Sequence, residues 1–315
     1  MKQNPEIAIV YNEQSGNGKW KRLKARIVKM LSQESYKVEL FNILDLNETQ
    51  KRELLKDGNK SIIITAGGDG TLSSFERDVM KYNPNQVISH LPTGSTNDLS
   101  NKFAYNEKST LKILKEILTG EVYETDVCTI NNEVWNYIAA LGTIPSVTYS
   151  TPQQQKKVLK KFAYFINAAQ KITSDGFNLY DVEYKINGKT YQETCSNILI
   201  SNAPGFGGFR KIFRKANFSD RQFEATFITA KNIKEAKELL KSLCYSSDKD
   251  LNNVAHVKNF TTQKVELTFK SCPLDNWSLD GEKYQEKDER VTFGMYPKKL
   301  KFQVPRRSKG KLQGI

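Results

Sequence analysis

The segment Ile62-Ile63-Ile64-Thr65-Ala66-Gly67-Gly68-Asp69-Gly70-Thr71-Leu72 carries the clearest structural signal in the chain. A β-branched run ends in two glycines, an acid, a third glycine and a hydroxyl residue, and a helical pattern continues to Tyr82. This order predicts a buried strand, a tight turn and the start of a helix. Glycines let the backbone approach a ligand closely, and a helix N-terminus favours anions. The turn is therefore a candidate phosphate site in which Asp69 would meet magnesium or a hydroxyl, although a plain strand–helix turn could contain the same residues.

Two more turns of this kind lie on either side of it in the sequence. The strand-like residues 7–11 lead into Asn12-Glu13-Gln14-Ser15-Gly16-Asn17-Gly18, and the strand-like residues 87–91 lead into Pro92-Thr93-Gly94-Ser95-Thr96-Asn97-Asp98-Leu99. Both segments join an apolar run to a helical pattern through glycine and small polar residues, so both are candidate phosphate-binding turns. Asn97 or Asp98 could also serve only as the cap of the following helix.

The first part of the chain alternates strand and helix patterns. Strands are expected over residues 7–11, 38–41, 62–66 and 87–91, and helices over residues 19–32, 48–56, 72–82 and 109–119. This alternation predicts a doubly wound parallel α/β domain over residues 1–127. Because ligands bind such sheets at the C-terminal ends of the strands, we expect the three glycine-bearing turns to meet in one cleft.

The pattern changes after Asp126. Helical patterns occur only at residues 153–172 and 233–244, and Asn187-Gly188 is a strong signal of a tight hairpin. We therefore expect a mostly antiparallel β-sandwich domain over residues 128–304, followed by a basic tail over residues 305–315 that packs back on the first domain. The expected strands cover residues 134–140, 178–186, 191–201, 223–230, 254–260, 264–269, 291–295 and 301–304.

Length and composition restrict the class of protein. The 315 residues suffice for two domains, 38% of them are hydrophobic, and no apolar run has the length of a membrane span. The N-terminus leads directly into a strand without a signal peptide, so we expect a cytoplasmic protein. The four cysteines lack metal-ligand spacing and are expected to be free thiols. With only His90 and His256, both in strand-like runs, acid–base chemistry falls to carboxylates.

Positive charge is concentrated in one window. The net charge is +13, and residues 151–215 hold 11 Lys or Arg against 4 Asp or Glu, a net +7. Such a surface could attract nucleic acid, an anionic membrane or nucleotide phosphates, or it could be a solvated face that aids solubility.

Together the motifs resemble, in order and spacing, the lipid kinases with a diacylglycerol kinase catalytic domain, which sphingosine and ceramide kinases share. Glu13 replaces the proline of the family's first turn, and Ser95 stands at a usual threonine. NAD kinases share the second and third motifs, but there the third lies in the second domain, whereas here Pro92 follows Thr71 by one strand–helix unit. The matching segments are 12–16, 67–71, 92–98, 125–126, 201–202 with 205–208, and 280–282.

The resemblance implies a NAD kinase/diacylglycerol kinase-like fold, ATP and Mg²⁺ as cofactors, and transfer of the γ-phosphoryl group to a lipid hydroxyl. Diacylglycerol is the expected acceptor, giving phosphatidic acid; phosphatidylglycerol or a sphingoid base are alternatives. Glu282, or Asp280 beside it, would act as the base, and Asp69 would act at the phosphates. The implied nucleotide-binding residues are Asn12, Ser15, Gly16, Gly67, Gly68, Asp69, Gly70, Thr71, Gly94, Ser95, Asn97 and Asp98.

One departure concerns a structural magnesium ion that the family holds with an Asp-Gly-x-Leu-Asp segment. The equivalent segment here is Asp220-Arg221-Gln222-Phe223-Glu224, so the glycine and the second aspartate are replaced. If the ion is retained, Asp220 would supply a carboxylate, and carbonyl groups near Asn217 and Gln222 would complete the site. A weakened or absent ion is the alternative.

A lipid kinase must take its substrate from a membrane. The basic window, with the aromatic residues Phe206, Phe209 and Phe213, is expected to contact anionic lipid headgroups transiently at the inner face of the membrane. The helix at 153–172 could be a lipid-facing flap, but core packing is the simpler expectation. No motif indicates nucleic-acid binding, and a homodimer is compatible with the sequence.

A second class of function is a nucleotide- or lipid-binding regulator that has lost catalysis. The replacements at Glu13, Arg221 and Glu224 favour it, whereas the retained acids Asp69, Asp280 and Glu282 favour an enzyme.

Overall fold

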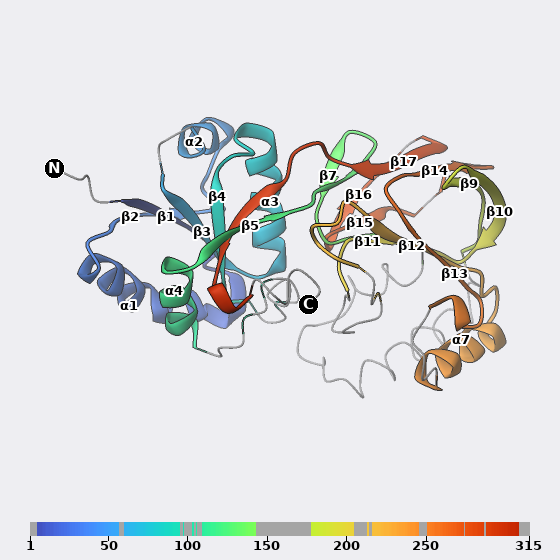
Figure 1. Ribbon diagram of the computed structural model, residues 1–315, viewed down its shortest axis with the longest axis horizontal. Helices are drawn as coiled ribbons and strands as arrows, with labels where there is room; N and C mark the ends of the chain where they lie inside the picture. The colour runs from blue at the N-terminus through green and yellow to red at the C-terminus, as the bar shows by residue number, and fades with distance from the viewer. Residues whose placement is uncertain are drawn as a thin grey trace. The chain divides into compact units, whose positions relative to one another are not determined.

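A computed structural model describes the protein over residues 5–56, 60–94, 97, 103, 105, 109–142, 178–204, 213, 216–245, 251–273, 275–286 and 288–308. The chain forms two compact units (Figure 1). Residues 1–127, 218–220 and 296–315 make the first unit, and residues 128–217 and 221–295 make the second. Within the described residues, no helix is long and apolar enough to cross a membrane.

The first unit is built on a six-stranded sheet in the order β2-β1-β3-β4-β18-β5. Strands β1 to β4 and β18 pair in parallel, and β5 runs antiparallel to β18. The strands are β1 (Glu6–Tyr11), β2 (Lys37–Asn42), β3 (Ile62–Gly67), β4 (Val87–Pro92), β5 (Glu121–Thr125) and β18 (Leu300–Val304). The helices are α1 (Lys19–Gln33), α2 (Glu48–Leu54), α3 (Asp69–Tyr82) and α4 (Thr110–Leu118). This arrangement confirms the predicted doubly wound α/β domain.

Helices α1 and α4 cover the same face of this sheet. Alternate residues of β1 and β3, such as Ile7 and Ile62, pack in one buried cluster with Ile27 and Leu31 of α1 and Ile113 of α4. The apolar periodicity of both helices therefore buries one face of each, and it leaves their basic faces exposed.

Strand β18 corrects the expected place of residues 301–304, which the strand pattern had assigned to the second domain. It lies between β4 and β5 in the first sheet, with Phe302 opposite Ile88 and Tyr123 (Figure 1). The side chain of Phe302 is fully buried and its ring lies 4.7 Å from that of Phe103. The alternation of apolar and polar residues predicts a strand with one buried face. It does not identify the sheet that the strand joins, because either sheet could bury that face.

The second unit contains two antiparallel six-stranded sheets, in the orders β10-β9-β14-β17-β6-β7 and β13-β12-β11-β8-β15-β16. Their facing side chains form one core, in which the rings of Tyr184 and Phe227 stack 3.9 Å apart. This confirms the predicted β-sandwich. The strands are β6 (Cys128–Ile130), β7 (Glu133–Trp135), β8 (Ile138–Gly142), β9 (Tyr180–Ile186), β10 (Lys189–Cys195), β11 (Asn197–Ser201), β12 (Phe223–Ile228), β13 (Val257–Thr262), β14 (Val265–Phe269), β15 (Trp277–Leu279), β16 (Glu282–Tyr284) and β17 (Arg290–Met295).

Helix α7 (Ile233–Tyr245) packs behind the second of these sheets. Ile198 and Ile200 of β11 belong to the core between the sheets, whereas Leu199 packs with Leu239 of α7 on the other face. Strand β11 is therefore buried on both sides, which explains its continuous apolar sequence.

Two long expected strands are each divided in the structure. Residues 191–201 belong to β10 and β11, which lie in different sheets on either side of Ser196. Residues 134–140 belong to β7 and β8, which are separated where backbone amides turn to the Asp280 carboxylate. The Asn187-Gly188 hairpin is confirmed, with φ angles of 51° and 77° that fit a type I′ turn. His256 lies in a turn with φ 61° and not in a strand.

The fully buried His90 of β4 predicts a pH dependence of stability. Its Nδ1 atom lies 2.8 Å from the hydroxyl oxygen of Thr65, and burial lowers the pKa of His90 to about 3. The unfolded state binds a proton near pH 6.5 that the folded state does not bind, so stability is complete above pH 6.5 and falls as the pH drops toward 3. We expect a loss of about 2 kcal/mol between pH 7 and pH 5 in urea unfolding of the wild-type chain, and a smaller loss in His90→Gln. Equal losses in the two chains would contradict this assignment.

Candidate active site

Three turns of the first unit meet at the C-terminal edge of its sheet. β1, β3 and β4 are parallel neighbours, and the turns that follow them contain Gly16, Gly68 and Gly94. A Cβ atom on Gly16 would lie 1.7 Å from the Thr93 carbonyl oxygen, and one on Gly94 would lie 2.4 Å from the Gly68 Cα. The glycines are required here because the backbones of the three turns touch one another.

The N-terminus of α3 lies at this meeting point. Gly68 is its N-cap residue and makes no side-chain hydrogen bond to the helix. The N–H groups of a helix's first turn have no partner within the helix, and they favour anions. By contrast, the N–H groups of Thr93 and Gly94 both donate to the Gly67 carbonyl, at 2.9 Å. The geometry therefore favours α3, rather than the turn after β4, as the source of phosphate-binding amides.

Side chains of the turn after β4 add polar atoms to the site. Asn97 has φ 51° and donates from Nδ2 to the Gly94 carbonyl at 2.7 Å. Its Oδ1 atom and the hydroxyl of the fully buried Thr93 have no hydrogen-bond partner among the described residues. Buried polar atoms without partners are costly, so a bound ligand would satisfy them.

The turn after β1 is organised by Asn12. Its N–H donates to the Ala66 carbonyl at 3.0 Å, which links this turn to β3, and its Oδ1 accepts from the Gln14 N–H at 3.0 Å. Ser15 begins a short 3₁₀ helix (Ser15–Gly18) that leads into α1, and a Cβ on Gly68 would lie 3.5 Å from its hydroxyl oxygen. Asn12 and Ser15 thus lie beside the α3 N-terminus.

Lys19 is a site residue that the sequence reasoning missed. It is the first residue of α1, and its Nζ donates to the Pro92 carbonyl at 3.1 Å, so it bridges two of the three turns. Burial, and secondly the charge of Arg22, lowers the pKa of Lys19. A lysine directly after a Gly-x-Gly turn at a helix start was the signal that could have revealed this cation.

The two acids that are expected to supply the general base, Asp280 and Glu282, lie in the second unit, at the turn between β15 and β16. Asp280 and Gly281 have φ angles of 54° and 95°, as a two-residue type I′ turn requires. The buried Asp280 carboxylate accepts from three backbone N–H groups: that of Asn136 at 2.9 Å, that of Tyr137 at 2.7 Å and that of Ile138 at 3.0 Å. Glu282 starts β16 and is exposed. Asp280 therefore holds the turn in place, and Glu282 is the accessible carboxylate.

Several groups near the expected structural magnesium site have partners within the protein. Within the described part of the chain, no three His, Cys, Asp or Glu side chains are grouped to hold a metal ion. The buried Glu224 carboxylate accepts from Asn259 and Thr261, so it is used within its sheet. Lys299 places its Nζ 3.2 Å from the Ser219 carbonyl and 3.1 Å from the Asp126 carboxylate. The positive charge of Lys299 thus lies beside Ser219, the residue that precedes Asp220 in the sequence.

Arg221 has φ 63°, the left-handed conformation in which a glycine is favoured. Arg221 therefore adopts the left-handed backbone conformation that a glycine at this position would favour. Asn217 and Gln222 belong to the second unit and Asp220 to the first, so this predicted ligand set stays a prediction.

Several expected residues lie outside the described residues: Ser95, Asp98, Phe206, Phe209 and the helix expected at 153–172. Phe213 is described, and its expected contact with a membrane is wrong. It is only 2% exposed and packs in a core cluster with Leu199 and Leu239.

Comparison with known proteins agrees with this arrangement. Residues 6–130 match the diacylglycerol kinase catalytic domain. A diacylglycerol kinase of Bacillus subtilis (strain 168) is 24% identical over 230 residues, which is 72% of this chain and 75% of that protein. A diacylglycerol kinase of Staphylococcus aureus (strain bovine RF122 / ET3-1) is 23% identical over 233 residues, 74% of this chain and 73% of that protein. These matches support a lipid kinase of the diacylglycerol kinase type.

Solved structures show the same fold. A diacylglycerol kinase from Bacillus anthracis str. Sterne has a TM-score of 0.71 and 13% identity, with 96% of this chain and 98% of that chain covered. A NAD kinase from Archaeoglobus fulgidus, solved in complex with ATP, has a TM-score of 0.52 and 15% identity, with 98% and 99% covered. The chain therefore shares its fold with this NAD kinase as well as with the diacylglycerol kinase.

Proposed function

We propose that this lipid kinase transfers the γ-phosphoryl group of ATP to a lipid hydroxyl, with diacylglycerol as the acceptor and phosphatidic acid as the product. The observation that supports it most strongly is the N-terminus of α3, which lies where the turns after β1, β3 and β4 touch. A helix N-terminus surrounded by close-packed glycines suits the phosphates of a nucleotide.

In this proposal, the first unit binds ATP. The amides of Gly68, Asp69, Gly70 and Thr71 hold the phosphates, Lys19 adds a positive charge, and the side chains of Thr93 and Asn97 add hydrogen bonds. Phosphoryl transfer depends on such positioning and charge neutralisation. Asn12, Ser15, Gly16, Gly67, Gly94, Ser95 and Asp98 complete the proposed nucleotide site.

A carboxylate near the phosphates suits magnesium, because this ion prefers oxygen ligands and is usually shared with substrate phosphates. Asp69, in the first turn of α3, is the residue we assign to hold it. The ion would neutralise charge that develops on the phosphate oxygens. We keep Asp220, Asn217 and Gln222 as the proposed ligands of a second, structural ion, and no step of the reaction depends on them.

The second unit supplies the lipid site and the base. We assign the base to Glu282, because the Asp280 carboxylate is already used by three backbone amides. Glu282 would accept the proton of the lipid hydroxyl as its oxygen attacks the γ-phosphorus and ADP leaves. Contact with an anionic membrane surface would be transient and would bring the lipid to this unit.

The test is transfer of radiolabelled γ-phosphate in mixed vesicles that contain diacylglycerol, phosphatidylglycerol or a sphingoid base. We expect labelled lipid with the wild-type chain and none with Asp69→Ala or Glu282→Ala. Label on phosphatidylglycerol or a sphingoid base alone would change the acceptor. Label on NAD in a parallel reaction would overturn the proposal, and ATP binding without any labelled product would favour a regulator.

A further inference from the structure

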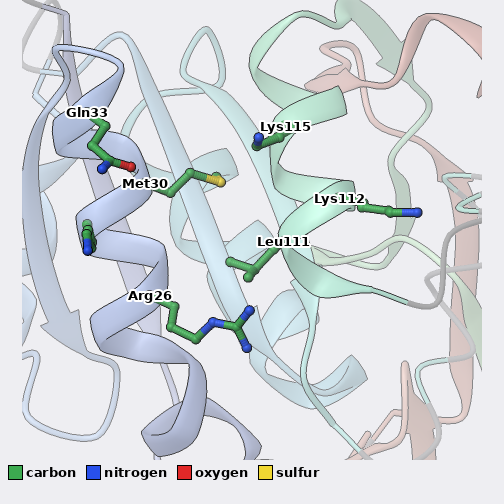
Figure 2. Close-up of a pocket in the computed structure, with 7 residues that line it drawn as sticks. Arg26, Met30, Gln33, Leu111, Lys112 and Lys115 are labelled. Carbon is green, nitrogen blue, oxygen red and sulfur yellow. The ribbon is translucent and has the colours of Figure 1, made fainter.

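A groove lies between α1 and α4 on the outer surface of the first unit, apart from the three turns. Its volume is about 480 Å³, within the range of roughly 300–1,000 Å³ typical of small-molecule sites. In Figure 2, Met30 of α1 and Leu111 of α4 extend into the space between the two helices. The lining residues are Arg26, Lys29, Met30, Gln33, Leu111, Lys112 and Lys115.

The charge of this groove has one sign. Four of its seven lining residues are Lys or Arg and none is acidic. Among the described residues, Arg26, Lys29 and Lys115 are exposed and their charged groups form no ion pair or hydrogen bond. Figure 2 shows the Arg26 guanidinium reaching toward α4, whereas the Lys112 ammonium extends away from α1. The groove therefore presents positive charge from both helices, with Arg26 on α1 and Lys115 on α4.

The floor of the groove is apolar. Met30 and Leu111 are partly buried and pack on the edge of the core cluster that joins α1 and α4 to the sheet. A free phosphate ion gains nothing from a thioether and a leucine, whereas the glycerol backbone and upper acyl chain of a phospholipid would bury both. The combination of cations around an apolar floor matches an anionic amphiphile.

We propose that the α1–α4 groove binds the headgroup of an anionic phospholipid and holds the first unit against a membrane. The site differs from the basic window at 151–215, which the sequence suggested. Because α1 begins directly after the turn that follows β1, Arg26 lies about 10 Å along the helix from that turn. A lipid in the groove would thus keep the ATP-binding unit at the surface from which the acceptor comes.

The test measures binding to vesicles of phosphatidylcholine with 30% phosphatidylglycerol (about one anionic lipid in three), by co-sedimentation without ATP. Since each Lys or Arg near an anionic surface strengthens binding about fivefold, Arg26→Glu/Lys115→Glu should weaken it at least tenfold. Lys56→Glu/Lys298→Glu is the matched control: it makes the same change in net charge at exposed lysines of the same unit outside the groove. We expect this control to bind within about threefold of the wild-type chain.

Equal weakening by both variants would overturn the proposal, because it would show attraction by net charge alone. Competition by glycerol phosphate at millimolar concentration would also overturn it, since the groove would then bind a free phosphate. The proposal would also be overturned if duplex DNA competed with the vesicles and only the groove variant lost DNA binding. Circular dichroism and thermal melting of both variants verify that they fold. Vesicle binding needs no turnover, so it can fail or succeed independently of the proposed kinase reaction.

Discussion

Replacement of Glu282 by glutamine is expected to lower the rate of lipid phosphorylation at least 100-fold without changing the melting temperature. General base catalysis contributes about 10²–10⁴ in rate, and glutamine retains the shape of the side chain but cannot accept the proton. Glu282 is exposed at the start of β16, so its replacement removes no core contact. Initial rates with saturating ATP and lipid, measured beside a thermal melt, give both quantities.

Asp280→Asn is the matched variant at the neighbouring acid. Unlike Glu282→Gln, it should lower the free energy of unfolding. An amide group offers one acceptor oxygen where the carboxylate serves three N–H donors, and its NH₂ would face a donor. We expect a loss of about 2 kcal/mol in the free energy of unfolding, because a buried backbone donor loses its partner. If Asp280→Asn melts like the wild-type chain while Glu282→Gln keeps full activity, the roles assigned here are wrong.

Replacement of Gly16 by alanine is expected to weaken ATP binding at least tenfold, whereas Gly18→Ala should change it less than threefold. Both glycines have a positive φ, of 63° and 73°, so both variants bear a similar backbone cost of about 1 kcal/mol. Only at Gly16 does the new Cβ meet another turn, 1.7 Å from the Thr93 carbonyl oxygen; nothing lies within 4 Å at Gly18. The clash would separate the turn after β1 from the turn after β4.

Isothermal titration of each variant with ATP measures the two affinities, and urea unfolding measures the shared backbone cost. Equal weakening in Gly16→Ala and Gly18→Ala would mean that contact between the turns is not needed for ATP binding.

The elements of the first sheet could be predicted because their signals are local. Strands β1, β3 and β4 are short apolar runs followed by glycine, and the pattern placed each within about a residue of its observed bounds. Parallel strands need helical crossovers, so the parallel pairing of these strands could be inferred from the alternation of strand and helix patterns. The place of β18 depends on a pairing with β4 that spans more than 200 residues, and no local pattern encodes it.

In the candidate site too, the local features could be predicted from the sequence, whereas the contacts between distant residues could not. The three glycine turns were visible in sequence, because a close backbone approach requires glycine itself. The bond from Lys19 to the Pro92 carbonyl was not visible, since it depends on the position of a carbonyl 73 residues away. The different uses of Asp280 and Glu282 were equally hidden: two carboxylates beside one glycine look alike until the amides of Asn136, Tyr137 and Ile138 are placed.

Hydrogen–deuterium exchange of the wild-type chain, with and without magnesium and a non-hydrolysable ATP analogue, tests whether the three turns form one nucleotide site. We expect slower exchange in three separate peptides at once, covering residues 12–19, 67–72 and 92–97, and no change in the β9–β10 hairpin at 180–195. Protection of only one of the three peptides, or protection confined to the second unit, would contradict the claim that the turns after β1, β3 and β4 form one nucleotide site.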